Sequence, residues 1–173
     1  MAILNPEHLF EQADALIRPP PAGPPRQVNL RRAISAAYYG IFHATVTSAA
    51  DLVIGAIHRG TKQYGLVYRS IDHRSLRELC EQAQRQKLPG RFSAYAPQNG
   101  FGPDIAAFAT AVIELQEKRH RADYDPLIRV NSADALLAVT TARAALARLQ
   151  QADSASRQAF LTFLLFRPRL GNH

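Results

Sequence analysis

The stretch RRAISAAYYGIFHA, residues 31–44, lies within the longest helical pattern of the chain. From Gln27 to about Gly55, apolar or small residues recur every three or four positions, as they do on the buried face of an α-helix. Many side chains in this stretch are small, which allows a neighbouring helix to approach closely. The stretch therefore predicts a long helix inside a helical fold. The recurring residues are Leu30, Ile34, Ala37, Ile41, Ala44, Ser48 and Leu52.

Further helices are predicted on both sides of this one. Asn5, Pro6 and Glu7 provide the capping side chain, the proline and the acid that are typical of a helix start. The proline-rich run RPPPAGPP, residues 18–25, ends that helix. We expect a single domain over residues 1–173. It would contain an N-terminal helix (1–18), a proline-rich linker (19–26), a core bundle (27–150) and a C-terminal helix (153–167).

Capping residues and breakers divide the core bundle into four helices. Residues 55–65, GAIHRGTKQYG, and the Pro/Gly/Asn-rich residues around 88–102 are predicted to be loops. Convincing strand alternation appears nowhere, so the predicted fold class is all-α, a four-helix bundle with extra N- and C-terminal helices. After the long helix, the next predicted helix starts at Ser70 or Asp72, and the one after it runs from Pro103 and Asp104 to about His120. A further helix is predicted from Asn131 or Ser132 to Gln150, and the C-terminal helix from Ser154 or Ser156.

The composition points to a globular protein with excess positive charge. The chain has 173 residues, of which 47% are hydrophobic, and 21 Lys and Arg against 14 Asp and Glu give a formal charge of +7. Most of these cations are arginines, which bind phosphates in a fork geometry and stack on bases. An anionic partner such as RNA fits this excess, and so does a preference for arginine codons.

Several classes of protein are disfavoured. The N-terminal sequence lacks the pattern of a signal peptide, and the apolar run AFLTFLLF, residues 159–166, is far too short to span a membrane. We therefore expect a cytoplasmic protein without a membrane segment, with this run buried in the chain or in a partner. Cys80 is the only cysteine, and its helical spacing predicts a buried thiol. No phosphate-loop, HExxH or GxSxG motif occurs, so we expect neither a cofactor nor a metal.

Two polar clusters are candidate sites. On the long helix, Ser35, Tyr39 and His43 share one face at four-residue steps, and Arg32 lies one step further back. This face is either a polar groove or an aromatic stripe with one hydrogen-bonded histidine. The second cluster is EKRHRADYDP, residues 117–126. It is either a functional site or a structural helix end in which Arg119 and Asp123, four residues apart, form an ion pair.

Together, these two stretches resemble the HEPN superfamily of small α-helical domains. The resemblance is to the branch with an AYYxxFHA-like helix and an RxxADYDP-like helix end, and it covers about residues 30–150. It implies an antiparallel four-helix bundle that is usually dimeric. Many members are metal-independent ribonucleases, others are toxins neutralised by a nucleotidyltransferase, and some are non-catalytic modules that bind nucleotides or proteins.

The resemblance makes Arg119 the match to the family's catalytic arginine. Four residues separate it from Tyr124, which stands where the ribonuclease members place a histidine. A histidine suits acid–base chemistry near neutral pH, whereas a tyrosine is a poor base there. His120 or His43 could replace the missing histidine in space, and Asp123 could act as a base or orient Tyr124. The literal histidine match, Arg167 to His173, we interpret as chance.

These arguments give two function hypotheses. The first is an RNA-acting toxin or defence component, a metal-independent endoribonuclease. Its catalytic candidates are Arg119, Asp123, Tyr124 and His120, and its substrate-binding candidates are Arg121, Tyr39, His43 and Arg32. The second is a non-catalytic helical module that binds a nucleotide or a protein partner such as a nucleotidyltransferase. By analogy with related toxin pairs, Tyr124 could be the residue that such a partner modifies. A homodimer is expected in either case.

Overall fold

A computed structural model of the chain describes residues 3–85 and 88–167. These residues form helices joined by loops and contain no strand, which confirms the all-α prediction. None of the helices in these two ranges combines the length and the apolar composition needed to cross a membrane. The α-helices are α1 (Pro6–Ile17), α2 (Gln27–Ile54), α3 (Lys62–Arg69), α4 (His73–Ala83), α5 (Gly90–Ser93), α6 (Gly102–Tyr124), α7 (Ser132–Gln151) and α8 (Ser154–Leu165), with one 3-10 turn, η1 (Ala56–His58).

The chain divides into two compact units. The first unit comprises residues 4–44 and 111–146, and the second comprises Ile3, 45–110 and the described residues from 147 onward. The boundary falls within α2, α6 and α7, so each unit holds a part of these three helices. The single domain predicted from chain length stays a prediction.

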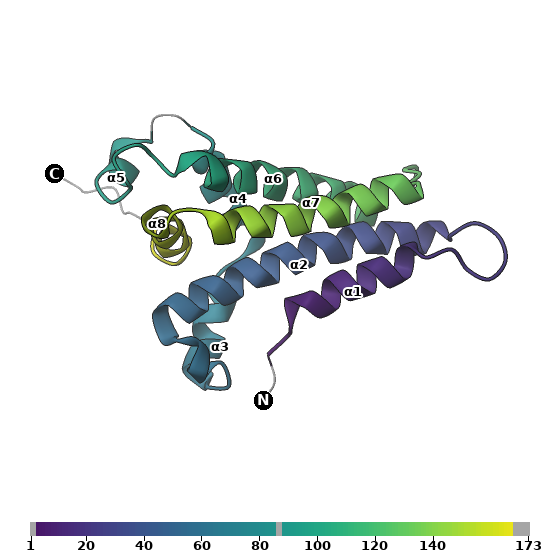
Figure 1. Ribbon diagram of the computed structural model, residues 1–173, viewed down its shortest axis with the longest axis horizontal. Coiled ribbons are helices and arrows are strands. Elements are labelled where there is room, and N and C mark those ends of the chain that lie inside the picture. The colour runs from purple at the N-terminus through teal and green to yellow at the C-terminus, as the bar shows by residue number, and fades with distance from the viewer. Residues whose placement is uncertain (1–2, 86–87, 168–173) are drawn as a thin grey trace. The chain divides into compact units, whose positions relative to one another are not determined.

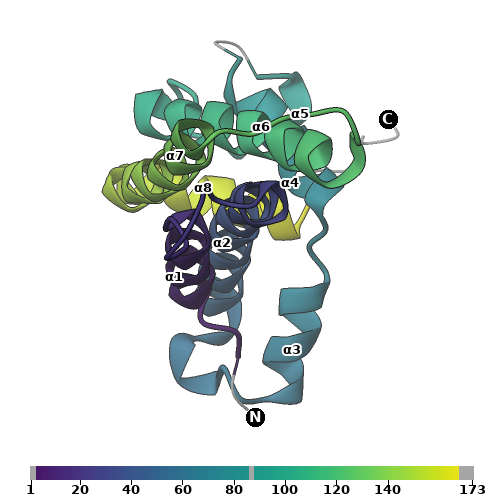
Figure 2. The same cartoon turned by 90° about the vertical axis from the view of Figure 1, so that its right-hand side faces the viewer.

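In the first unit, α1 lies antiparallel beside the first half of α2 (Figures 1 and 2). The side chain of Asn5 caps α1 by accepting a hydrogen bond from the Glu7 amide, as predicted. Gly40 of α2 lies directly under the buried Phe10 ring, because a Cβ atom at this position would be 2.7 Å from two ring carbons. The small side chains of α2 therefore do allow a helix to approach closely.

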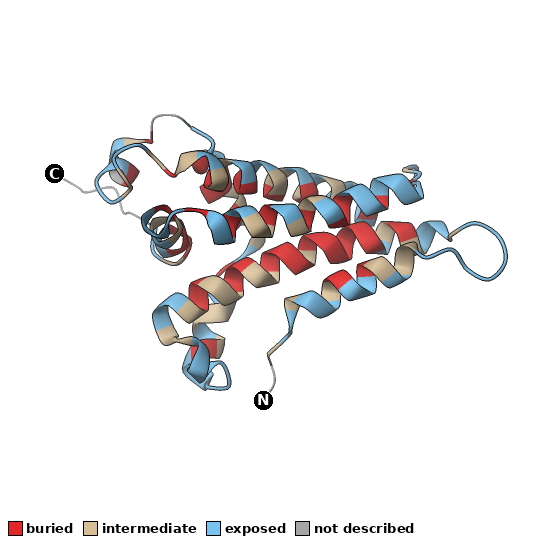
Figure 3. Cartoon of the chain, viewed as in Figure 1, coloured by how far each residue is buried: buried red, intermediate tan, exposed pale blue. Residues whose placement is uncertain are grey.

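The central part of α2 is buried on every side rather than along one stripe. Residues 33–38 are all buried, and six consecutive residues of an α-helix point in all directions (Figure 3). A helix that is covered all round needs small or apolar residues at nearly every position. This explains the run AISAAYYG, in which Ser35 is the one buried polar residue.

In the second unit, α4 packs against α8, and an aromatic cluster forms the core. Phe160 and Phe163 of α8 meet Phe101 edge to face, with ring centroids 5.8 Å apart in each pair. Phe160 also packs against Phe108 of α6, at 5.6 Å. The apolar run of residues 159–166 is thus largely buried within this chain, although Phe166 at its end is exposed.

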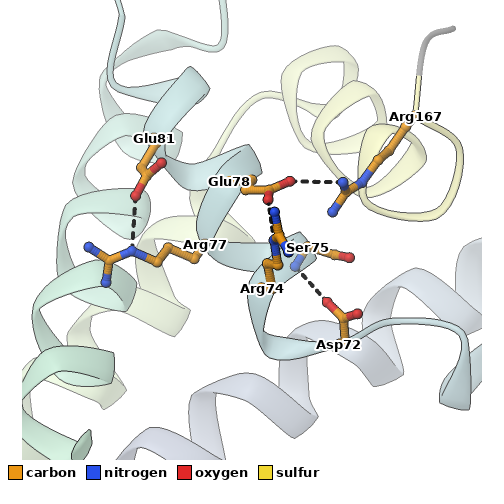
Figure 4. Close-up of polar contacts among 7 residues, drawn as sticks. All are labelled: Asp72, Arg74, Ser75, Arg77, Glu78, Glu81 and Arg167. Atoms are coloured by element: carbon orange, nitrogen blue, oxygen red, sulfur yellow. Dashed lines mark hydrogen bonds and ion pairs between the residues drawn. The ribbon is translucent and has the colours of Figure 1, made fainter.

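Charged side chains cover the outer face of α4 (Figure 4). Glu78 accepts a hydrogen bond from Arg74 at 2.7 Å and pairs with Arg167 at 2.8 Å, while Arg77 donates to Glu81 at 2.9 Å. These pairs lie at the surface, where solvent screens them, so they contribute little to stability.

Residues 55–65 are not the loop that the sequence predicted. They include η1 and the first residues of α3, which continues to Arg69. Thr61 caps α3 by accepting a hydrogen bond from the Tyr64 amide. The buried Tyr64 donates its hydroxyl hydrogen bond to Asp51, and burial raises its pKa to about 12. These tertiary contacts outweigh the glycines at positions 60 and 65.

Other limits differ from prediction in smaller ways. Helix α6 runs to Tyr124 rather than to about His120, and a short helix, α5, interrupts the loop predicted around residues 88–102. Helix α8 begins at Ser154, one of the two predicted starts, and Asp153 caps it. The predicted caps Asp72 and Asn131 are confirmed, since each accepts a hydrogen bond from an amide three residues on. Cys80 is buried as predicted, and burial raises the pKa of its thiol. His173 lies outside the described residues.

Candidate functional site

The two candidate stretches meet in the first unit, where the last turns of α6 contact the first half of α2. Arg119 donates a hydrogen bond from Nη2 to the Tyr39 hydroxyl oxygen, and its Nε lies 2.9 Å from Asp123 Oδ2. Asp123 Oδ1 in turn accepts a hydrogen bond from the Ser35 hydroxyl. A chain of four polar side chains therefore links the two helices, and the predicted Arg119–Asp123 ion pair is confirmed.

Arg31 completes this arrangement, although no pattern in the sequence pointed to its role. Its Nε donates to the carbonyl of Ala122 at 2.5 Å, and its Nη2 donates to the carbonyl of Asp125 at 2.6 Å. The last carbonyls of a helix lack partners within the helix. Arg31 therefore satisfies the C-terminal end of α6 and holds that end against α2. The carbonyl partners lie 91 and 94 residues away in sequence, so no local pattern could have revealed them.

Two tyrosine–histidine pairs flank the Arg119 guanidinium. Its Cζ atom lies 5.1 Å from the centroid of the Tyr39 ring and 5.9 Å from that of the Tyr124 ring. The His43 ring stacks on Tyr39 at 6.3 Å, and the His120 ring packs against Tyr124 at 5.0 Å. A cation between two aromatic faces is stabilised by the negative faces of both rings.

The environment fixes the charge states of two of these groups. Burial lowers the pKa of Arg119, but the hydrogen bond with Tyr39 and the nearby Asp123 and Tyr124 more than offset this and raise it overall, so the guanidinium stays charged. The half-buried His43 has a pKa below its ordinary value because burial disfavours the imidazolium. His43 is therefore neutral at pH 7 and can accept a proton.

A pocket of about 620 Å³ adjoins this cluster and lies wholly within the first unit. Tyr39, Asp123 and Ser35 form part of its wall, so the pocket shares three residues with the polar chain around Arg119. The remaining lining comes from α1, α2 and α6, namely Leu9, Gln12, Leu16, Gln27, Val28, Arg31, Arg32, Ala36 and Ala122.

The predicted site residues fall into three groups. Arg119, Asp123, Tyr39 and His43 lie in one connected cluster, and Tyr124 and His120 form the pair beside it. Arg32 lines the pocket. Arg121 is exposed on α6, and its side chain forms no hydrogen bond or ion pair with this cluster among the residues that the structure describes. Their functional roles stay predictions.

A metal centre has no support in the described ranges. Within residues 3–85 and 88–167, no group of three or more His, Cys, Asp or Glu side chains could hold a metal ion. Cys80, the only thiol of the chain, is buried in α4 of the second unit.

Comparison with protein-family models gave no match, and neither curated proteins nor solved structures matched the chain significantly. The geometry of the cluster around Arg119 and the two sequence motifs are therefore the features that bear on function.

Proposed function

We propose that this chain is a HEPN-like protein that acts on RNA as a metal-independent endoribonuclease of a toxin–antitoxin or defence system. An antiparallel four-helix bundle and a homodimer, as the resemblance implies, are parts of this proposal. The observation that carries it is the position of Arg119. Its side chain is only 17% exposed, it is held by Tyr39 and Asp123, and it lies between two tyrosine–histidine pairs.

The cluster contains groups suited to metal-free cleavage of RNA. Such cleavage needs a cation at the phosphate, a base for the 2′-hydroxyl proton and an acid for the leaving oxygen. Arg119 supplies the cation, and its orientation is fixed before any substrate arrives. Asp123 serves to orient Arg119, because both of its oxygens already face a partner.

The two histidines divide the proton transfers between them. Neutral His43 accepts the proton of the 2′-hydroxyl as the 2′-oxygen bonds to phosphorus. The bond from phosphorus to the 5′-oxygen then breaks, and this oxygen takes a proton from the exposed His120, which acts as the general acid. The products are a 2′,3′-cyclic phosphate and a 5′-hydroxyl. Arg119 stabilises the negative charge that develops on the phosphoryl oxygens in the transition state.

The chemistry of the product ends tests this assignment. Purified protein would be incubated with end-labelled single-stranded RNA in EDTA, and the new ends would be identified by mobility and phosphatase sensitivity. The proposal predicts cyclic phosphate ends, and no cut at a position where a single 2′-deoxy nucleotide replaces the cleaved one. Cleavage at that deoxy position would contradict attack by the 2′-hydroxyl. An unchanged cleavage rate in both His43→Gln and His120→Gln would show that these histidines do not carry out the assigned proton transfers.

A second candidate function is favoured by one specific observation. Hydrogen bonds and an ion pair link Ser35, Asp123, Arg119 and Tyr39, and a purely structural helix contact can contain such a network as well. In a non-catalytic module, the exposed Tyr124 would be available to a nucleotidyltransferase-type partner, since 65% of its surface is accessible. Labelling of wild-type protein but not of Tyr124→Phe by a nucleotidyltransferase encoded nearby would favour this function. Metal-independent RNA cleavage would favour the first.

A further inference from the structure

We propose that the pocket formed by α1, α2 and α6 binds one nucleoside monophosphate unit, with its base against α1 and its phosphate toward Arg32. This inference rests on the proposed RNA function and adds a specificity site to it. The unit would belong to single-stranded RNA next to the cleaved phosphate, and a free mononucleotide carries the same chemistry.

The inner wall of the pocket suits a flat apolar body. Leu9 and Leu16 of α1 and Val28 and Ala36 of α2 supply aliphatic surface, and Leu9 and Leu16 are half-buried while Val28 is 55% exposed. The pocket volume, about 620 Å³, lies within the range of about 300–1,000 Å³ typical of small-molecule sites. An exposed Val28 beside two half-buried leucines leaves apolar surface that a stacked base would cover.

Gln12 provides a polar group that could read the base. Its side chain lines the pocket and makes no hydrogen bond with the described part of the chain. A carboxamide offers donors and an acceptor side by side, which matches the edge of a base. Gln27 differs, because its amide is already used: Nε2 donates to the Val130 carbonyl at 2.7 Å, and Oε1 accepts from the Val130 amide at 2.9 Å.

The charge at the pocket favours a phosphate. Arg32 is exposed, lines the pocket and has no hydrogen-bond or ion-pair partner among the described residues. The adjacent Arg31 is committed to two backbone carbonyls. Tyr39 and Asp123, which form the pocket wall, are the two residues that hold Arg119. A phosphate in the pocket would therefore meet Arg32, which can form charged hydrogen bonds, while Arg119 lies behind the wall that Tyr39 and Asp123 form.

An alkyl chain with an acidic head is the other ligand that an aliphatic pocket with a cationic rim would accept. Such a ligand would make no use of the Gln12 amide, which is exposed at the pocket. The nucleotide uses this amide, and we therefore assign the pocket to it.

Calorimetric titration of the full chain with AMP, GMP, CMP, UMP and, as the alkyl anion, octanoate tests the assignment. Leu16→Trp fills the pocket, and Leu4→Trp adds the same side chain at an exposed position outside it. Arg32→Gln removes the proposed phosphate contact, and Arg18→Gln removes the same charge from an exposed position that does not line the pocket. All variants would first be checked for unchanged melting.

The proposal predicts binding of at least one mononucleotide. Leu16→Trp should weaken it by about tenfold or more. Arg32→Gln should also weaken it by about tenfold or more, as expected for the loss of a charged hydrogen bond. Leu4→Trp and Arg18→Gln should stay within about twofold of wild type, because surface changes away from a site have small effects. Gln12→Ala should alter the preference among the four bases.

Three results would overturn the pocket assignment: no nucleotide binding by wild-type protein, equal loss in the pocket variants and their controls, or tighter binding of octanoate than of any nucleotide. These outcomes differ from failure of the proposed function. Cleavage that depends on Arg119 but shows the same base preference and rate in Leu16→Trp would reject the pocket and keep the ribonuclease. Nucleotide binding that Leu16→Trp abolishes, without any RNA cleavage, would keep the pocket and reject the ribonuclease.

Discussion

Arg31 should be the residue whose removal most directly separates α6 from α2. It donates two hydrogen bonds, of 2.5 and 2.6 Å, to the carbonyls of Ala122 and Asp125. A hydrogen bond that involves a charged group contributes about 1.5–3 kcal/mol, and a cation at a helix C-terminus adds about 0.3–1 kcal/mol. Because Arg31 is only half-buried, we take the low end of each range for its two hydrogen bonds and its position at the helix end, and expect Arg31→Ala to lower the free energy of unfolding by about 3 kcal/mol.

The assay is urea unfolding followed by far-UV circular dichroism, with the transition midpoint and slope fitted for each variant. Arg32→Ala is the matched control, since Arg32 is the next residue, carries the same charge and is exposed. It should change stability by less than about 0.5 kcal/mol. Arg31→Lys keeps the charge but cannot form the fork, so it should fall between the two.

An Arg31→Ala protein within about 0.5 kcal/mol of wild type would refute this reasoning. So would a loss of equal size in Arg32→Ala, because the effect would then come from net charge. Either result would mean that the two carbonyl contacts do not hold the end of α6.

Three further predictions concern the first unit. Gly40→Ala should destabilise the protein by about 1–3 kcal/mol despite the higher helix propensity of alanine, because its Cβ would overlap the Phe10 ring; a more stable variant in thermal melting would contradict this. Ser35→Ala should cost about 1–2 kcal/mol in urea unfolding, through loss of its hydrogen bond to the Asp123 carboxylate, and an unchanged midpoint would show that this bond contributes nothing. The lowered pKa of His43 means that the unfolded chain binds its proton first as pH falls. Stability should therefore decline below the ordinary pKa of 6.5, and His43→Gln should decline less; equal pH profiles would contradict this.

Local patterns in the sequence predicted most of the helices. Helix starts with a strong capping signal, such as Asn5 before Pro6 and Asp72 before α4, are where predicted. These signals act within three or four residues, so one sequence suffices to see them. The ion pair between Arg119 and Asp123 was predictable for the same reason, because both residues lie on one turn of α6.

Contacts between distant residues explain what the sequence could not predict. Helix α6 continues past His120 through a polar turn in which only Ala122 is buried, so apolar periodicity is lost there. This turn is held by Arg31, far away in sequence. Likewise, α3 forms around Tyr64, whose hydroxyl reaches Asp51 at 2.9 Å, although glycines nearby suggest a loop.

The candidate site, too, could be predicted from the sequence only in part. The shared face of Ser35, Tyr39 and His43 followed from helical spacing, and each of the first two contacts a residue of α6 in the structure. The pocket could not be predicted, because α1 forms one of its walls and nothing in the sequence indicates where α1 packs. The proline-rich run between α1 and α2 does not predict how these two helices are oriented relative to each other.

The most direct test of the central claim is cleavage of end-labelled single-stranded RNA and tRNA by the purified chain in EDTA, with Arg119→Ala beside wild type. Both proteins would first be compared by circular dichroism and melting. We predict metal-independent cleavage by the wild-type protein and a loss of about 100-fold or more in the variant, as is typical when a charge-stabilising donor is removed. A folded wild-type protein that does not cleave, or an Arg119→Ala variant that cleaves equally well, would contradict the claim that Arg119 acts on RNA.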